Sequence, residues 1–375
     1  MTKSRESKAT GRSSEIDGLR AISALVVVFN HAGLSVFPGN TGVTFFFVIS
    51  GYVITLTLLS ELSFSSGFSI SKFLLRRFFK LFPPLVGIVI LPSILFFKLL
   101  NLSALGIISQ LFFYFNWIDI TFPELQVLPG SGVVWSLSVE EQFYISIAIF
   151  WLIIIKIASN HAVKLLACFY ILIYAYSTLC RVYIHFSDSS SRDGYNEILR
   201  IMRGTDSRMS AIAVGGLLAI FVSQFMKRLN LNLSIFYNWQ FILACSCFLL
   251  ILSRRYDSSL VIDVFQFNLS ELSIGLVIMH VAIRDKKVGF SVFNLLNLKL
   301  LQVIGLCSYS IYLSHMIFIE SLEAVGIFNI GILKMDLIGS IFKIILGVII
   351  GIICHKLFDA PFESRRARYR TSRPV

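Results

Sequence analysis

Apolar runs of about 20 residues, separated by short polar segments, recur along almost the whole chain. An α-helix needs about 20 apolar residues to cross the hydrocarbon core of a bilayer, so the pattern predicts an all-α, polytopic membrane protein. We expect about ten transmembrane helices from this pattern. Their approximate ranges are 18–37, 42–62, 83–101, 134–156, 164–186, 208–226, 238–253, 259–283, 299–322 and 337–357.

The apolar stretch 103–117, "SALGIISQLFFYFNW", is shorter than the others. At about 15 residues it suits a re-entrant or interfacial helix better than a full span. An eleventh span would place the two termini on opposite sides and leave the basic stretch "ESRRARYRTSR" outside the cell. Since Lys and Arg favour cytoplasmic segments, we expect ten spans with both termini in the cytoplasm.

Composition agrees with a membrane protein: 56% of the residues are hydrophobic and 14% are charged, whereas soluble proteins contain about 25% charged residues. A net charge of +12 could indicate a nucleic-acid partner, but Lys and Arg cluster just outside the apolar runs. We therefore interpret them as membrane-flanking charges and expect no nucleic-acid partner. The six cysteines lie in apolar stretches without metal-ligand spacing, which predicts packing roles and neither a disulfide framework nor a metal site.

The pattern divides the chain into a cytoplasmic N-terminal segment (1–15), a membrane domain (16–362) and a basic cytoplasmic tail (363–375). The first apolar run is not followed by the small-residue cleavage site of a signal peptide, so we expect this span to be retained.

The first predicted span contains two ionisable residues, Arg20 and His31. They are eleven residues apart, which is about three helical turns, so both side chains lie on nearly the same face and about 16 Å apart along the axis. Arg20 then lies near the inner surface and His31 in the outer half. An ionisable group inside a bilayer is costly unless it is paired or faces a cavity. Snorkelling of Arg20 and a structural hydrogen bond of His31 are the alternatives to a functional role.

In the second span, Gly51 allows another backbone to approach closely. Two groups of polar residues come after this span. Arg76, Arg77 and Lys80 form a basic group before an expected break at Pro83 and Pro84. On a helix Arg77 and Lys80 share a face, which suits either a polyphosphate ligand or a positive-inside anchor.

The stretch "WSLSVEEQFY" opens the fourth span with a polar stripe, because Ser136, Glu140 and Tyr144 are spaced four residues apart. Glu140 could orient His31, act as a base itself, or form a structural pair with an arginine such as Arg208.

Further polar residues lie in later spans. Tyr312 and His315 share a face of the ninth span, with His315 in the outer half like His31, and Asp206 and Arg208 are expected at the outer surface. Together these residues predict a polar cavity between helices that is lined by histidine and carboxylate. Such a cavity suits general acid–base catalysis, although a proton-coupled transporter would contain similar residues.

The stretches "DGLRAISALVVVFNH", "FFFVISGYVIT", "RRFFKLFPP", "WSLSVEEQFY" and "SYSIYLSHM" occur in this order. As a set they resemble the acyltransferase-3 family of membrane O-acyltransferases, over about residues 15–362. The resemblance implies a core of ten spans in the bacterial inner membrane. It also implies an acyl-CoA donor, commonly acetyl-CoA, that is taken from the cytoplasm, and a hydroxyl acceptor on a cell-envelope glycan or glycolipid.

The resemblance also assigns roles to residues. The family's Arg and His with ten residues between them fall on Arg20 and His31, with His31 as catalytic base or transient acyl carrier. The family's Arg-x-x-Arg motif falls on Arg77 and Lys80, and Arg76 is the residue that could compensate for the lysine, which lacks a bidentate guanidinium. The acidic residue of the "WSL" motif falls on Glu140.

We assign substrate contacts in the polar cavity to six residues. They are Ser136, Tyr144, Asp206, Arg208, Tyr312 and His315.

The sequence therefore favours a membrane O-acyltransferase that uses acyl-CoA and no metal. A transporter or flippase for a lipid-linked saccharide is the alternative, but we find no inverted repeat of the kind that transporters contain. A glycan polymerase is a third hypothesis, and the short outer loops argue against it. Because the basic tail ends the sequence, we expect that transfer to the final acceptor needs either no second domain or a separate partner.

Overall fold

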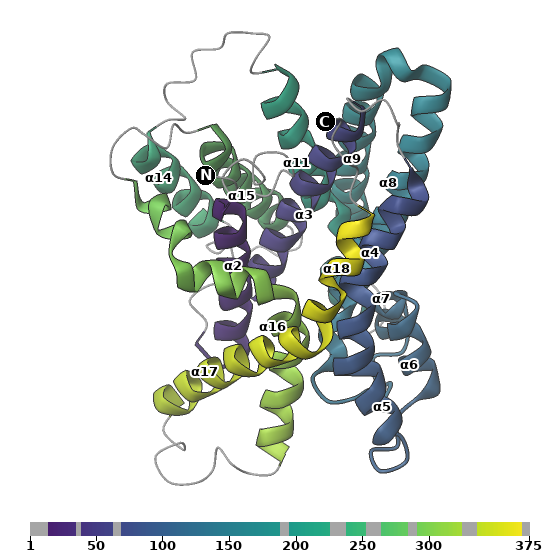
Figure 1. Cartoon of the computed structure of the whole chain (residues 1–375), viewed down its shortest axis with the longest axis vertical. Helices are drawn as coiled ribbons and strands as arrows, with labels where there is room; N and C mark the ends of the chain where they lie inside the picture. Colours follow the sequence, from purple (N-terminus) through teal and green to yellow (C-terminus); the bar gives the residue numbers. More distant parts are fainter. Residues whose placement is uncertain are drawn as a thin grey trace. The chain divides into compact units, whose positions relative to one another are not determined.

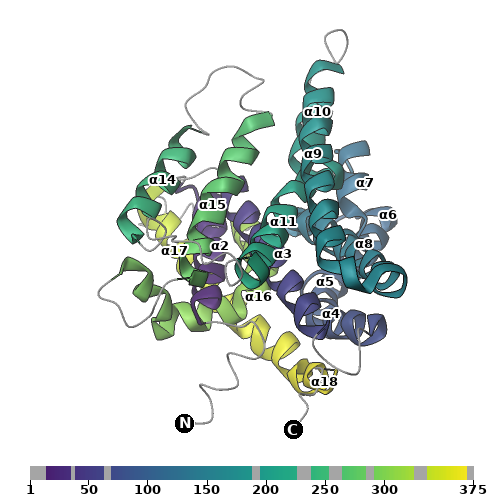
Figure 2. The same ribbon diagram turned by 90° about the horizontal axis from the view of Figure 1, so that it is seen from above.

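The computed structural model describes residues 14–34, 39–62, 69–187, 195–225, 238–252, 264–283, 291–324 and 336–369. Within these ranges every regular element is helical (Figures 1 and 2), as expected for an all-α protein. Seven helical segments of the described residues are long and apolar enough to cross a membrane, which indicates a multi-pass membrane protein. They are Asn40–Glu61, Ile70–Leu95, Ser131–Ser187, Asn196–Gln224, Gln266–Ile283, Lys299–Ala324 and Leu337–Arg368.

The difference between seven segments and ten predicted spans has identifiable sources. The segment Ser131–Ser187 combines the predicted spans 134–156 and 164–186. Helix α14 (Trp239–Leu252) is apolar but has only 14 residues, and helix α2 (Ser14–His31) has charged residues in its first turns. Most of the predicted N-terminal segment and residues 370–375 of the tail lie outside the described residues, so the cytoplasmic placement of both termini stays a prediction.

The chain divides into two compact units, each built from three stretches of sequence. Unit 1 comprises Met1–Leu19, Thr44–Phe68 and Ile149–Gln302. Unit 2 comprises Arg20–Val43, Ser69–Ala148 and Val303–Val375.

In unit 2 the end of the chain folds back onto an early helix. Three consecutive elements pack against helix α4: the π-helical turn η9 (His355–Asp359), the short helix η10 (Ala360–Phe362) and helix α18 (Glu363–Arg368). Figure 1 shows α18 beside α4. The other main elements of unit 2 are α4 (Ile70–Leu85), η1 (Val86–Ile90), α5 (Leu91–Leu95), η2 (Ser131–Val133), α17 (Asp336–Cys354), and parts of α2, α8 (Val134–Ala158) and α16 (Lys299–Ala324).

Helix α4 continues through Pro83 and Pro84, so the break that we expected there does not occur. Ser69 caps its N-terminus, accepting a hydrogen bond from the backbone N–H of Lys72 at 3.4 Å. The two prolines cannot donate backbone hydrogen bonds, so the helical hydrogen-bond pattern is interrupted there. The π-helical turn η1, which begins just after α4 ends, accommodates this interruption. The basic residues before the prolines therefore belong to the same continuous segment, Ile70–Leu95, as the apolar run after them.

The stretch 103–117 forms two short helices, α6 (Ala104–Leu111) and α7 (Phe115–Thr121). Eight residues of helix extend only about 12 Å, far less than the roughly 30 Å of the hydrocarbon core. Neither helix alone is long enough to cross, and the re-entrant or interfacial placement of this stretch stays a prediction.

Unit 1 contains a close helix pair. Helix α11 (Thr205–Ile220) packs against α9 (Ala162–Ser187) and α15 (Gln266–Ile283), and α14 packs against α15. A Cβ added to Gly51 of α3 (Gly39–Leu62) would overlap the backbone of Ile212, and one added to Gly215 of α11 would overlap that of Val48. The expected close approach at Gly51 is confirmed, and the contact between α3 and α11 is reciprocal. The remaining elements of unit 1 are α10 (Tyr195–Arg203), η3 (Ser159–His161), η4 (Phe221–Phe225) and η6 (Val292–Asn297).

We predict that Gly51→Ala lowers the melting temperature of the purified protein in detergent. Forcing a methyl group against the backbone of Ile212 separates two packed helices, and overpacking of this kind costs about 1–3 kcal/mol. The matched control is Gly275→Ala on α15, where the added Cβ meets only side-chain atoms of Leu218 at 3.2 Å and Val214 at 3.5 Å. A Gly51→Ala protein as stable as Gly275→Ala would contradict the reciprocal contact.

Candidate active site

Two histidines of unit 2 face each other at the end of α2. Nδ1 of His31, the last residue of α2, lies 2.8 Å from Nε2 of His315 on α16. Their ring planes are 10° apart, with centroids separated by 5.1 Å. His31 is partly exposed, whereas His315 has no exposed surface. The structure thus brings together two residues that are 284 positions apart in the sequence.

His315 is held in place on several sides. Its Nδ1 lies 3.0 Å from the carbonyl oxygen of Ile311, and the ring centroid of Tyr312 is 5.9 Å from its own. Gly347 of α17 covers it so closely that an added Cβ would lie 3.3 Å from the Cβ of His315. Gly130 has φ +75°, which favours glycine, and an added Cβ there would overlap the backbone of Met316, the residue after His315. His315 therefore has little room to change its rotamer.

The polar stripe predicted on α8 contacts two neighbouring helices. At its start, the Ser136 hydroxyl donates to the Tyr312 oxygen at 2.7 Å, and Tyr312 donates to the carbonyl of Val133 at 3.1 Å. Two turns later, the guanidinium carbon of Arg77 lies 4.1 Å from the centre of the Tyr144 ring, a cation–π contact. The stripe thus extends from α16 beside the histidine pair to α4.

In unit 2 the charges of three arginines act on one lysine, Lys80, and we call these four cationic side chains the cation cluster. They are Arg20 of α2, Arg77 and Lys80 of α4, and Arg366 of α18. The expectation that Arg77 and Lys80 share a helical face is confirmed, because both lie within α4. Since like charges repel, such a cluster is stable only when nearby anions or a bound anionic ligand compensate it.

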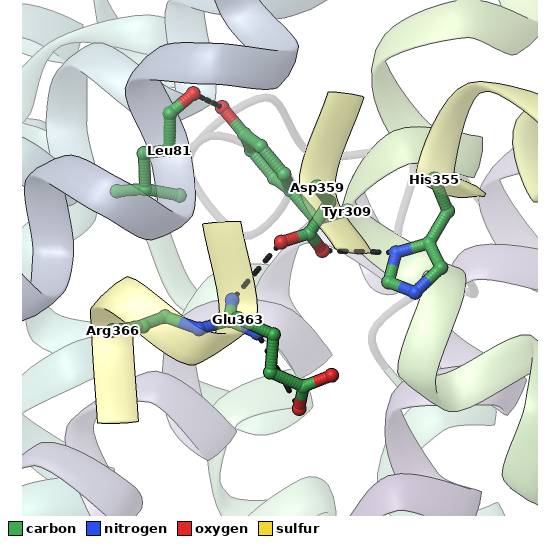
Figure 3. A network of polar contacts seen from close by, with 6 residues as sticks. All are labelled: Leu81, Tyr309, His355, Asp359, Glu363 and Arg366. Carbon is green, nitrogen blue, oxygen red and sulfur yellow. Dashed lines mark hydrogen bonds and ion pairs between the residues drawn. The ribbon is translucent and has the colours of Figure 1, made fainter. Parts of the chain in front are cut away.

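Figure 3 shows how the C-terminal segment brings an acid to this cluster. Asp359 accepts a hydrogen bond from Arg366 at 3.0 Å and pairs with Nδ1 of His355 at 2.9 Å. Its charge also acts on Lys80. In the same view the hydroxyl of Tyr309 donates to the carbonyl of Leu81 at 2.8 Å, which ties α16 to α4 beside Lys80.

Two adjacent carboxylates of α8 lie near the cluster. The charges of Arg77 and Lys80 act on Glu141, and Glu140 acts on Glu141 and on Tyr309. One carboxylate oxygen of Glu141, Oε1, is buried and makes no hydrogen bond within the described residues. Orienting His31 was one of the three roles left open for Glu140, and in the structure Nδ1 of His31 lies against His315.

Arg76, which we grouped with Arg77 and Lys80, contacts the end of the chain. Its guanidinium donates to the carbonyl of Tyr369 at 2.9 Å, and the Phe79 ring stacks on the Tyr369 ring with centroids 5.8 Å apart. Sequence reasoning missed Arg366 because we interpreted the basic end of the chain as a membrane-flanking tail. The spacing of Glu363 and Arg366, which form an i,i+3 ion pair at 3.7 Å, was the available signal for a helix there.

Asp206 and Arg208 belong to unit 1, where each has structural partners. Asp206 pairs with Arg200 at 2.9 Å. Arg208 donates to the hydroxyl of Thr44 at 3.0 Å and lies 4.3 Å from the centre of the Phe267 ring. Their proposed contact with substrate stays a prediction. Within the described residues, no three His, Cys, Asp or Glu side chains are grouped as metal ligands.

Comparisons with known proteins agree with the sequence motifs. O-acetyltransferase OatA of Staphylococcus aureus is 26% identical over 366 residues, covering 93% of this chain and 57% of the relative. Peptidoglycan O-acetyltransferase OatA of Listeria monocytogenes is 33% identical over 156 residues, covering 39% of this chain and 25% of the relative. The chain thus spans little more than half the length of the Staphylococcus protein. No solved structure matches.

The family model described as "Acyltransferase domain" matches residues 13–356, which include nearly all of the candidate site. This range covers most of the chain, so the chain belongs to the acyltransferase-3 family of acyltransferase domains.

Proposed function

We propose that this chain is a membrane O-acyltransferase of the bacterial inner membrane. It moves an acyl group, which we propose is acetyl, from acyl-CoA on the cytoplasmic side to a hydroxyl of a cell-envelope glycan. Family membership supports acyl transfer, and the name of the Listeria relative suggests peptidoglycan as the acceptor class. The observation that carries the proposal is the occurrence in unit 2 of a cation cluster and a histidine pair, both of which include a residue of α2.

The cation cluster suits the anionic part of the donor. Coenzyme A contains a pyrophosphate and a ribose phosphate, and guanidinium groups bind phosphate with paired hydrogen bonds. Lys80 supplies only a point charge, but Arg20, Arg77 and Arg366 supply three guanidinium groups. A bound phosphate would reduce the repulsion among the cations of the cluster, so electrostatics favours the donor-bound protein.

The distance between cluster and histidines suits the shape of the donor. Arg20 and His31 are about 16 Å apart along α2, and Tyr309 and His315 are about 9 Å apart along α16. Coenzyme A has a long, flexible arm between its phosphates and its thioester. With its phosphates at the cluster, this arm extends along the helices toward His31.

In the reaction, His31 acts as general base. A hydroxyl is a poor nucleophile at neutral pH, and an imidazole is suited to take its proton as the oxygen attacks the thioester carbonyl. The carbon–sulfur bond then breaks, and the leaving thiolate takes the proton from the imidazolium. The products are the glycan ester and free coenzyme A, with His31 returned to its neutral state.

The remaining site residues have supporting roles in this proposal. Glu140 and Glu141 balance the charge of the cluster, and Arg76 fixes the C-terminal segment on α4. The contact of Ser136 with Tyr312 and that of Tyr144 with Arg77 hold α8 against α16 and α4. Asp206 and Arg208 are assigned to the acceptor.

We predict that Arg77→Ala and Arg366→Ala each raise the KM for acetyl-CoA by about 10–100-fold, the value of one charge-assisted hydrogen bond. The turnover number kcat should change little, because neither residue contacts the reacting atoms. Release of free coenzyme A by the purified protein measures both constants, and Lys80→Arg should be tolerated. The control is Arg368→Ala, an exposed arginine of the same helix α18. An unchanged KM in the Arg366→Ala protein would show that this residue only anchors α18.

We also predict that His31→Ala lowers kcat by about 10²–10⁴-fold while acetyl-CoA still binds, because the base is lost and the cluster is intact. His161→Ala, at an exposed histidine, is the matched control. In cells, mass spectrometry should show loss of acetyl esters from the glycan. Normal acetylation in a well-expressed His31→Ala strain would reject the mechanism, and a wild-type protein that leaves acetyl-CoA intact would favour a transporter.

A further inference from the structure

We propose that His315 is a positioning residue that fixes the tautomer of His31 and leaves Nε2 of His31 as the catalytic base. This inference rests on the proposed function. It follows from the direction of two hydrogen bonds in unit 2, between Ile311 and His315 and between His315 and His31.

The direction of both hydrogen bonds is set by the backbone carbonyl of Ile311, which can only accept. The carbonyl oxygen of Ile311 has no proton, so Nδ1 of His315, 3.0 Å away, must carry the hydrogen of that bond. In a neutral imidazole with hydrogen on Nδ1, Nε2 has the lone pair and accepts. Nδ1 of His31, 2.8 Å from this Nε2, must then be the donor.

The consequence for His31 is a single tautomer. With hydrogen on Nδ1, its Nε2 holds the lone pair and can take a proton from the acceptor hydroxyl. When it does so, Nδ1–H of the new imidazolium still donates to Nε2 of His315, so the charged state is stabilised without rearrangement. The tautomer is therefore set by a backbone carbonyl, through one intervening imidazole.

A neutral partner is suited to this environment. In hydrolases with a Ser-His-Asp triad, a carboxylate performs the same orienting role. A carboxylate beside His31 would need to be buried in the membrane domain, where an unpaired charge is costly. His315 accepts the same hydrogen bond without adding a charge.

Burial argues against direct contact of His315 with substrate, the role that we assigned to it from the sequence. The side chain has no exposed surface, and Gly347 and the backbone of Ile311 lie against it. His31 is partly exposed and is the member of the pair that a substrate can reach.

The test compares two substitutions of His315 in the purified full chain. His315→Leu cannot accept a hydrogen bond, whereas the amide oxygen of His315→Gln lies near the former Nε2 and can. We expect His315→Leu to lower kcat for acetyl-CoA turnover by about 10²–10⁴-fold, the range seen when a catalytic histidine loses its orienting partner or a base is removed. The kcat of His315→Gln should be at least tenfold higher than that of His315→Leu. In both proteins the KM and the dissociation constant for acetyl-CoA should stay within threefold of wild type. His161→Gln is the control for histidine replacement at an exposed site.

Three outcomes would overturn the inference, and a fourth concerns the proposed function. Wild-type kcat in His315→Leu would show that the pair is not needed. Equal loss in His315→Gln and His315→Leu, with acetyl-CoA still bound, would show that an acceptor at this position is not the requirement. Loss of acetyl-CoA binding in both proteins would assign His315 a structural or donor-binding role. Failure of the wild-type protein to consume acetyl-CoA would instead reject the proposed function itself.

Discussion

A charge inside a bilayer is tolerated only where the protein itself supplies partners for it, and the arrangement of unit 2 follows from this constraint. The charges of Arg20, Arg77 and Arg366 all act on Lys80, with carboxylates of α8 and η9 nearby. Holding four cations close together costs electrostatic free energy, and packing of the helices does not require it. It is understandable if the cluster exists to receive the phosphates of a donor.

The histidine pair meets the same constraint with neutral groups. Nδ1 of His31 and Nε2 of His315 are paired with each other, and Ile311 supplies the carbonyl that sets the direction of the chain of bonds. Small residues around the pair, Gly347 and Gly130, let α17 and the segment before α8 approach α16 closely. Close packing thus fixes the position of a side chain whose chemistry depends on orientation.

The C-terminal segment has a larger role than its basic composition indicates. Its helix α18 and the preceding turn pack on α4, Arg76 binds the backbone of Tyr369, and Arg366 joins the cluster through Asp359. In the proposed function, a segment that contributes one cation and fixes its neighbours would couple the end of the chain to donor binding. Family membership over residues 13–356 does not include α18, so this coupling is a feature that the match alone does not describe.

The sequence by itself determined the helical class, because runs of apolar residues in a membrane have no alternative to internal backbone hydrogen bonding. Helical periodicity likewise related Arg77 to Lys80 and Ser136 to Tyr144, since both pairs lie within single helices. It also placed Arg20 and His31 at opposite ends of one face of α2. Motif order identified the family. These results depend on local spacing, which a sequence records directly.

Only the tertiary structure decided which distant residues meet. It placed His315 opposite His31, a role for which Glu140 was one candidate. It also brought Arg366 to Lys80, and it carried α4 through Pro83 and Pro84 into a π-helical turn. The physical reason is that contacts between helices depend on how their faces pack, and several partners of suitable chemistry compete for each position. Spacing along the chain cannot choose between a carboxylate and an imidazole for the same nitrogen, whereas the packing of α8, α16 and α17 does.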